Sequence, residues 1–417
     1  MYNKSLYCKV TVIHTQRISG NRPANNHTSR VTNTRKRERT IPLCTKPHNA
    51  AVDVVITVHN MESCVAACLE SLIRQTVPPS HIIIVEDGST DASATVIDSF
   101  AKNDSRFTVI STNGIGAGAA RNRGMQKVSA PYFMLLDGDD VFHPTMIESL
   151  HRAAEDGNAD ISICDMREMD DATGAFTHPL WALKQSQLPP TAAFDGWRAM
   201  SGNLFAAFMG WPWDKLYRTE FVRGAGLAFP EDLANSEDML FTYQALVLAK
   251  RLAVVNKVLI DHRMGRGGTV SSSREKAPIA FYDAICRMKS FLQQQPDDTW
   301  IKLQQDYLNW AFDWTLWNIE TMADEGIRRM LTQRLHDGAF PGLQLDSRPA
   351  SFFTLYPRSM VRYAVLMTWL DADTRDDGPL GNLKRLPYDK HKFWDFMNPV
   401  EKALTVWREK HPKPSEW

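Results

Sequence analysis

The sequence predicts an α/β fold, with a largely parallel sheet followed by a helical C-terminal module. Between about residues 50 and 165, short apolar runs alternate with stretches of helical periodicity. Several of these runs end in acidic or glycine-containing turns. Residues 276–417 lack the alternation, have mainly helical patterns and are rich in tryptophan. Regular strand–helix alternation is typical of parallel sheets, whose ligands bind at the carboxyl ends of the strands.

The predicted strands are short runs of β-branched and other apolar residues bounded by turn signals. Five runs have this character, namely 52–58, 82–85, 107–110, 132–136 and 161–164. We expect them to be buried strands of one sheet.

Helical periodicity separates these runs. The first predicted helix follows residues 52–58 and ends before Pro78-Pro79. Thr90 or Asp91 is expected to cap the second helix. Pro144 is expected at the first position of the helix that precedes 161–164.

The formal net charge is zero, so no overall positive field attracts nucleic acid. Residues 1–50 nevertheless hold ten basic residues and one acidic residue, Glu38. We expect this segment to be a solvated, disordered tail, and contact with an anionic membrane surface or another polyanion is the alternative. We therefore expect a basic tail over 1–49, an α/β domain over 50–275 and a helical module over 276–417.

The sequence predicts no membrane span and no secretory signal. The longest apolar candidate, 352–370, is interrupted by Arg358 and Arg362. The six cysteines are scattered and form no CxxC pair. Reduced thiols, as in a cytoplasmic protein, are therefore expected.

Three carboxylates, Asp137, Asp139 and Asp140, directly follow the run 132–136. Carboxylates this close repel one another unless a cation neutralises them. Mg²⁺ and Mn²⁺ prefer such oxygen ligands and usually share them with substrate phosphates. The motif therefore indicates a metal site, and an acidic turn with helix-capping aspartates is the alternative.

Two other segments could contact a nucleotide. Asp87 follows a strand end and can accept hydrogen bonds from a base or a ribose, although a plain strand–turn–helix connection explains it equally well. The small residues of 113–124 allow close approach of a ligand, and Arg121 can pair with a diphosphate. This loop departs from the GxGxxG pattern of dehydrogenases because Ala119 replaces the last glycine.

Taken together, five motifs resemble those of family 2 inverting glycosyltransferases, which have the GT-A fold. They occur in the family's order and spacing at residues 58–62, 68–76, 86–89, 120–124 and 136–140. The resemblance implies a Rossmann-like GT-A domain for nucleotide-diphospho-sugars. It implies a nucleotide pocket formed by Thr57, His59, Asn60, Glu62, Asp87 and Arg121.

The resemblance also implies that Asp137 faces the ribose and that Asp139 holds the metal, with both in the metal site. The chain departs from the family pattern at two positions. Thr57 stands where a proline is usual, and Glu86 replaces the first of two aspartates.

The resemblance extends to about residue 275. Trp213, Asp214 and Lys215 resemble the family's acceptor-side block, and Glu237 is expected on the same side. Asp238 then corresponds to the catalytic base, a role that an inverting displacement requires of one carboxylate. An acidic helix N-terminus is the alternative interpretation of Glu237-Asp238.

The basic segment 262–271 resembles the family's loop that closes on the diphosphate. An exposed basic turn is the alternative. The residues expected to contact the donor are Arg263, Arg266, Thr269 and Ser271. Farther along, the aromatic residues Tyr307, Trp310, Trp314 and Trp317 recur at helical spacing, which favours a packed helix face over sugar stacking.

The resulting prediction is a hexosyl- or N-acetylhexosaminyltransferase that uses Mn²⁺ or Mg²⁺ and a nucleotide sugar, with a UDP-sugar expected. The acceptor would be a glycan, a polyol-phosphate or a lipid-linked molecule in cell-surface polysaccharide, teichoic acid or glycolipid assembly. We expect the protein in the cytoplasm, with a peripheral contact at the inner membrane face left open. The alternatives are a sugar-phosphate nucleotidylyltransferase and a non-catalytic binding scaffold.

Overall fold

The computed structural model describes residues 51–266, 274–296 and 298–345, together with residues 359, 362, 363, 366, 367 and 370. The predicted tail over 1–49 lies outside the described residues. Thr269 and Ser271 also lie outside them.

Four parallel strands form the first half of the sheet. They are β1 (Val52–Val58), β2 (His81–Asp87), β3 (Phe107–Thr112) and β4 (Tyr132–Asp137), in the spatial order β3-β2-β1-β4. All of β1 is buried, because it lies between two strands and is covered on both faces. The continuous apolar run of its sequence therefore fits its position.

The second half of the sheet is mixed. The short strand β9 (Lys215–Arg218) runs antiparallel between β4 and β6 (Ile161–Asp170), and β10 (Leu252–Met264) runs parallel to β6. The remaining strands are β5 (Val141–Phe142), β7 (Phe176–Thr177) and β8 (Ala193–Phe194). β5 and β8 pair with β10, and β7 pairs with β6. The predicted α/β fold with a mostly parallel sheet is confirmed.

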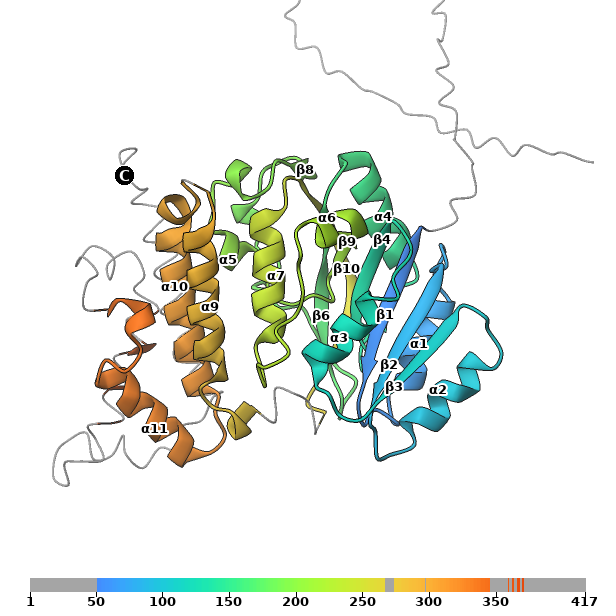
Figure 1. The fold of residues 1–417 in the computed structure, drawn as a ribbon, viewed down its shortest axis with the longest axis horizontal. Coiled ribbons are helices and arrows are strands. Elements are labelled where there is room, and N and C mark those ends of the chain that lie inside the picture. The colour runs from blue at the N-terminus through green and yellow to red at the C-terminus, as the bar shows by residue number, and fades with distance from the viewer. Residues whose placement is uncertain are drawn as a thin grey trace, which may run out of the picture. The chain divides into compact units, whose positions relative to one another are not determined.

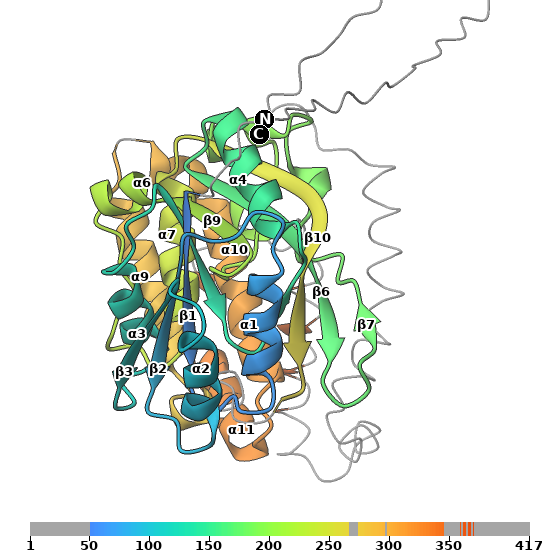
Figure 2. The ribbon, with the colours of Figure 1, turned by 90° about the vertical axis from the view of Figure 1, so that its right-hand side faces the viewer.

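Helices cover both faces of the sheet (Figures 1 and 2). The helices before residue 250 are α1 (Val65–Ile73), α2 (Ser93–Ala101), α3 (Ala117–Met125), α4 (Met146–Gly157), α5 (Leu204–Ala207), α6 (Thr219–Gly224) and α7 (Glu237–Leu248). The later ones are α9 (Ala280–Gln294), α10 (Thr299–Glu320) and α11 (Glu325–His336). Short 3₁₀ helices occupy Gln185–Gln187, Trp197–Ala199, Arg274–Lys276 and Pro341–Leu343.

Alternate side chains of β1 enter two separate hydrophobic layers. Val54 and Ile56 pack with residues of α1 and α4 on one face. Val55 packs on the opposite face, in the layer that includes α7, α9 and α10. This alternation follows from the two-residue period of a strand.

The C-terminal helices pack against the sheet domain through aromatic side chains. Trp310 of α10 stacks on Phe205 at 5.5 Å and meets Tyr243 of α7 edge-on at 5.0 Å. The Tyr307 hydroxyl donates a hydrogen bond to the Ile285 carbonyl. These rings therefore form a packed helix face, as their spacing predicts, and the helical C-terminal region is confirmed over the described residues.

Two local predictions are wrong. The N-cap of α2 is Ala92, one residue after Asp91, although the Asp91 carboxylate accepts hydrogen bonds from the amide and hydroxyl of Ser93, the first residue of the helix. α4 begins at Met146 with Thr145 as its N-cap, so Pro144 precedes the helix. The Pro144 carbonyl accepts a hydrogen bond from the Thr76 amide, which fixes it in the preceding loop.

Within the described residues, no helix combines the length and apolar character needed to cross a bilayer.

Candidate active site

The site forms at the carboxyl ends of β2 and β4, the two strands that flank β1. Val58 of β1 pairs with Glu86, one residue before Asp87, and Thr57 pairs with Asp137. The parallel register therefore brings the acidic turns after β2 and β4 to the same edge of the sheet.

Asp87 organises the glycine–alanine loop before α3. Its carboxylate accepts hydrogen bonds from the Thr112 hydroxyl and from the amides of Ile115 and Gly116, at 2.7–2.8 Å. Burial acts to raise the pKa of Asp87, but these three hydrogen bonds hold it below its usual value. Gly88 follows with φ 70°, and a Cβ there would lie 2.8 Å from the Gly114 nitrogen. Only glycine fits this turn without strain.

Side chains after β1 tie that strand to the turn after β2. The Nδ1 of His59 hydrogen-bonds the Asp87 carbonyl at 2.7 Å. Asn60 accepts a hydrogen bond from the Thr90 amide, and Glu62 accepts one from the Ala92 amide. Asn60 itself has a left-handed backbone, φ 52°. These contacts shape one wall of the site.

The three aspartates after β4 converge. One oxygen from each of Asp137, Asp139 and Asp140 can be chosen so that all lie within 4.8 Å of one another. Desolvation, followed by the charges of Asp140 and Asp137, raises the pKa of Asp139 to about 6. Carboxylate oxygens that lie close together repel one another, and such a set of oxygen ligands suits a hard divalent cation. The residues present therefore fit a metal ion.

Basic side chains at the end of β10 and just after it lie beside this cluster. Arg266 donates two hydrogen bonds to the Asp139 carboxylate, at 3.0 and 3.1 Å, and one to the Asn60 carbonyl. Arg263 donates to the Asp139 carbonyl and pairs with Asp171. The two arginines expected to contact the donor diphosphate thus lie beside the carboxylates that could hold a metal ion.

Asp140 and His262 form a buried pair that the sequence interpretation did not single out. The His262 Nδ1 lies 2.9 Å from Asp140, which is fully buried and also accepts the Arg263 amide. Burial opposes the charged imidazole, but Asp140 prevails and raises the pKa of His262 to about 9. The third carboxylate of the acidic motif was a signal for Asp140. No local pattern identifies His262, because its partner lies 122 positions away.

Arg121 connects the carboxylate cluster to α7. Its guanidinium donates to Asp137 at 2.9 Å and to Glu237 at 3.0 Å, and all but 7% of the residue is buried. The guanidinium also lies over the Phe229 ring, 5.4 Å from its centroid. Its position between two carboxylates brings together residues that are far apart in the sequence.

Asp238 lies beside Glu237 in the first turn of α7. Its carboxylate accepts the Met239 amide at 2.7 Å. Desolvation and then the charge of Glu237 raise the pKa of Asp238 to about 7, against the opposing effect of Arg121. A carboxylate with a pKa near neutrality is suited to accept a proton.

The block expected on the acceptor side is largely buried. Lys215 is fully buried, and its ammonium donates to Asp214 and to the carbonyls of Met209 and Trp211. Trp213 is 2% exposed and stacks on His262. Lys215 and Asp214 therefore hold the backbone beneath the site.

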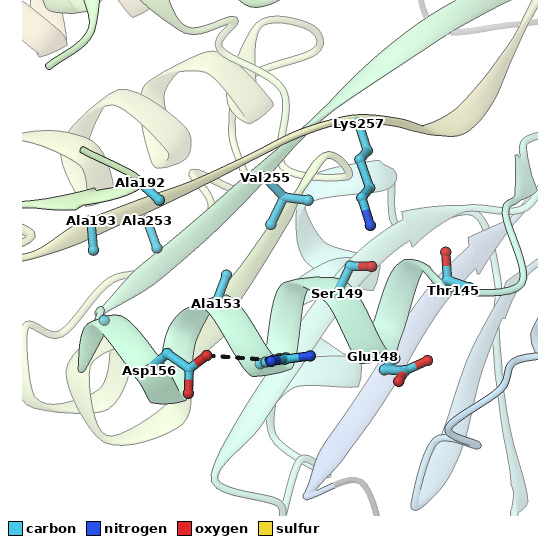
Figure 3. A pocket seen from close by; sticks show the side chains of 12 residues that line it. Thr145, Glu148, Ser149, Ala153, Asp156, Ala192, Ala193, Ala253, Val255 and Lys257 are labelled. Carbon is cyan, nitrogen blue, oxygen red and sulfur yellow. Dashed lines mark ion pairs between the residues drawn. The ribbon is translucent and has the colours of Figure 1, made fainter. Parts of the chain in front are cut away.

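A separate cavity lies between α4 and the strands β8 and β10 (Figure 3). Alanines from both strands form one side, and the Arg152–Asp156 ion pair of α4 forms the other. It shares no lining residue with the carboxylate cluster.

Comparison with known proteins agrees with this geometry. Residues 53–210 match the family model described as glycosyl transferase family 2. The chain is 31% identical over 253 residues to the putative glycosyltransferase EpsH of Bacillus subtilis, a match that covers 58% of this chain and 70% of EpsH. It is 29% identical over 212 residues to the uncharacterized glycosyltransferase EpsJ of the same organism, covering 51% of this chain and 60% of EpsJ.

A third relative is the Staphylococcus aureus poly(ribitol-phosphate) beta-N-acetylglucosaminyltransferase TarS, 23% identical over 235 residues. That match covers 56% of this chain and 39% of TarS. The crystal structure of TarS 1–349 in complex with UDP-GlcNAc superposes with a TM-score of 0.58 at 20% identity, over 78% of this chain and 91% of that one. At this identity the likeness shows a shared GT-A fold.

Proposed function

Because this chain belongs to glycosyltransferase family 2, we propose that it transfers a sugar, with inversion, from a UDP-sugar to an acceptor hydroxyl. The observation that carries the proposal is the pair of Arg121 contacts. They place Asp137 of the carboxylate cluster and Glu237, the neighbour of Asp238, on one guanidinium. A donor-binding element and a candidate base thereby meet in one site.

Asp238 acts as the base in this proposal. Inversion by a single displacement requires one carboxylate to take the proton of the attacking hydroxyl. The pKa of about 7 leaves Asp238 able to accept that proton near neutral pH. Arg121 holds Glu237 and thereby fixes the first turn of α7 relative to Asp137, and Glu237 is the residue expected on the acceptor side.

Asp137 and Asp139 would hold the cofactor, Mn²⁺ or Mg²⁺, and Asp140 completes the oxygen cluster. A divalent ion bound there supplies positive charge against the departing diphosphate. Arg263 and Arg266, from the end of β10, lie next to the same carboxylates and add cationic groups for that phosphate.

The wall formed by Thr57, His59, Asn60, Glu62 and Asp87 is the proposed nucleotide pocket. Asp87 is anchored by amides of the glycine–alanine loop, so its orientation is fixed before a nucleotide binds. A carboxylate held in this way is a preorganised hydrogen-bond acceptor, which suits the N–H edge of a base or a ribose hydroxyl.

The acceptor class follows from the relatives. TarS is named as an N-acetylglucosaminyltransferase of poly(ribitol-phosphate). We place the present chain in cell-surface glycan assembly, with a glycan, polyol-phosphate or lipid-linked acceptor. Action in the cytoplasm, with or without a peripheral membrane contact, stays a prediction.

A donor screen tests the proposal. The full chain is incubated with Mn²⁺ and a panel of UDP-, GDP- and dTDP-sugars, and both thermal shift and release of nucleoside diphosphate are measured. We expect a UDP-sugar to stabilise the protein and to be hydrolysed slowly without acceptor. Formation of a nucleotide sugar from UTP and a sugar 1-phosphate would instead identify a nucleotidylyltransferase. Binding of a nucleotide sugar without any turnover, whichever acceptor is added, would identify a non-catalytic scaffold.

A further inference from the structure

Three tryptophans and His262 form a continuous aromatic column beside the carboxylate cluster. The Trp213 ring stacks on His262 at 4.7 Å and 18°, and Trp211 stacks on Trp213 at 4.9 Å and 17°. Trp181 meets Trp211 edge-on, with centroids 5.7 Å apart and planes at 71°. These four residues are the aromatic column.

The column runs from the buried site toward solvent. At its inner end His262 contacts Asp140 at 2.9 Å. Trp213 is 2% exposed, Trp211 is partly buried, and Trp181 at the outer end is 43% exposed. The exposed ring is thus linked to the metal-binding carboxylates through continuous ring contacts.

The exposed end is held in place from both sides. His178 pairs with Asp165 at 2.8 Å before it, and Leu183 forms a β-bridge with Phe208 after it. The Ala182 amide donates to the Pro179 carbonyl across the turn that carries Trp181. An exposed aromatic ring on an anchored turn loses little entropy when it binds a ligand.

The backbone of the middle tryptophan is also fixed from inside. The Lys215 ammonium donates to the Trp211 carbonyl at 2.7 Å and to the Met209 carbonyl at 3.0 Å. The buried Lys215 ammonium thus donates two hydrogen bonds to this loop and fixes the backbone that carries Trp211. The backbone beside each of the two outer rings is therefore held by hydrogen bonds.

We propose that Trp181 and Trp211 form a stacking subsite for a sugar ring of the acceptor. The proposal rests on the proposed function and narrows its acceptor class to molecules that contain a pyranose. The C–H face of a pyranose packs against the flat indole, whereas an open polyol-phosphate chain offers no such face. Trp213 and His262 connect this subsite to Asp140 of the carboxylate cluster.

Leu180, 81% exposed beside Trp181, provides the matched control. A surface that contacts lipid would depend on both apolar side chains. A sugar-stacking surface depends on the ring of Trp181 and tolerates Leu180→Ala. The variants for comparison are therefore Trp181→Ala, Trp181→Phe and Leu180→Ala in the full chain.

The experiment measures binding in the presence of UDP and Mn²⁺. The probes are an array of glucose, galactose and N-acetylglucosamine oligosaccharides, a ribitol-phosphate oligomer, and phosphatidylglycerol vesicles. We expect at least one oligosaccharide to bind, with affinity about tenfold lower in Trp181→Ala, largely restored in Trp181→Phe and unchanged in Leu180→Ala. UDP should stabilise all variants equally.

Three outcomes overturn the inference: no oligosaccharide binds, oligosaccharide binding is unchanged in Trp181→Ala, or the dependence on Trp181 appears only with ribitol phosphate or vesicles. The UDP arm separates this result from the proposed function. If UDP and all UDP-sugars fail to bind the wild-type chain, the proposed function fails. If they bind and the sugar arm fails, only the stacking subsite is wrong.

Discussion

Arg121 of α3 and Glu237 of α7 form a buried ion pair of 3.0 Å across 116 positions of sequence. The same guanidinium pairs with Asp137 at 2.9 Å. A single cation thereby fixes the distance between the carboxylate cluster and the helix that carries the candidate base. This one side chain therefore contacts both halves of the site.

Replacing Arg121 with alanine should separate the two halves of the site. We expect transfer to fall by at least about 100-fold, because loss of alignment in an active site has effects of that size. Leaving buried carboxylates unpaired should also lower the free energy of unfolding by about 3–5 kcal/mol. Steady-state kinetics and urea unfolding measure the two effects. Arg74→Ala is the control, since its exposed pair with Glu70 contributes at most about 1 kcal/mol.

Asp238→Asn should abolish transfer while leaving donor affinity unchanged. In the wild type, only the ionised Asp238 can accept a proton, and its pKa is about 7. We therefore expect kcat/KM to rise with pH and level off above an apparent pKa near 7. Glu237→Gln removes a charge that raises this pKa, so its acid limb should move to lower pH. An acid limb that stays in place in Glu237→Gln would contradict the role of Glu237.

The raised pKa of Asp238 should also affect how the free energy of unfolding depends on pH. The pKa of Asp238 is raised in the folded state, so the folded protein binds more protons than the unfolded chain between about pH 4 and 7. Asp238 should therefore contribute a decrease in the free energy of unfolding as pH rises through this window. Asp238→Asn should make that decrease shallower in urea unfolding at a series of pH values. An identical slope in the variant would show that Asp238 has an ordinary pKa.

Asp139→Asn tests the cation site. At pH 7.5 we expect Mn²⁺ to raise the Tm of the wild type and EDTA to reverse the gain, since a ligand that binds the folded state stabilises it. The variant should lose the Mn²⁺-dependent shift together with transfer activity. Asp156→Asn, on the exposed face of α4, should keep both. A wild type that is fully active in EDTA would refute the metal requirement.

Arg266→Ala tests whether the arginine competes with the cation. Its guanidinium contacts the Asp139 carboxylate at 3.0 Å, where a metal ion would also bind. Removing it should tighten Mn²⁺ binding severalfold, because a positive charge beside the ligand is lost. Transfer should nevertheless slow, since the leaving phosphate loses a cationic partner. Mn²⁺ titration followed by electron paramagnetic resonance, together with kcat, separates the two effects, and weaker Mn²⁺ binding would contradict the competition.

Two glycines form a matched pair for packing. A Cβ at Gly124 of α3 would lie 2.2 Å from Cγ1 of Val55 in β1, so Gly124→Ala should destabilise the fold by about 1–3 kcal/mol. A Cβ at Gly224, the last residue of α6, would meet nothing within 4 Å. Gly224→Ala should change the free energy of unfolding by less than about 1 kcal/mol. Urea unfolding compares them directly, and equal effects would show that α3 can move away from the sheet.

The strands that the sequence predicts are those with continuous apolar runs. β1 and β4 belong to this class because they are covered on both faces. β9 escaped prediction because it has four residues, two of them charged, and lies in the sheet only through its antiparallel neighbours. This segment is a strand because it pairs with β4 and β6, which are distant in the sequence, and a short stretch of sequence contains no sign of that pairing.

The site residues divide in the same way, into those that local motifs predict and those that only the fold brings together. The motifs at Asp87 and Asp137–Asp139 are local in sequence and lie together at the strand ends. The contacts of His262 with Asp140 and of Lys215 with the Trp211 carbonyl depend on how distant segments fold back. Whether the predicted residues bind donor and acceptor as expected stays a prediction for the experiments above.

The position of β9 has a consequence for the nascent chain. β9 lies between β4 and β6 but is synthesised after both. While the ribosome translates the segment between β6 and β9, β4 has one unpaired edge, and the main part of β6 still lacks both neighbours, β9 and β10. Unpaired strand edges are sites of association between chains. β4 and β6 therefore keep unpaired edges until β9 and β10 have left the exit tunnel, and chaperones that recognise strand edges should act during that interval.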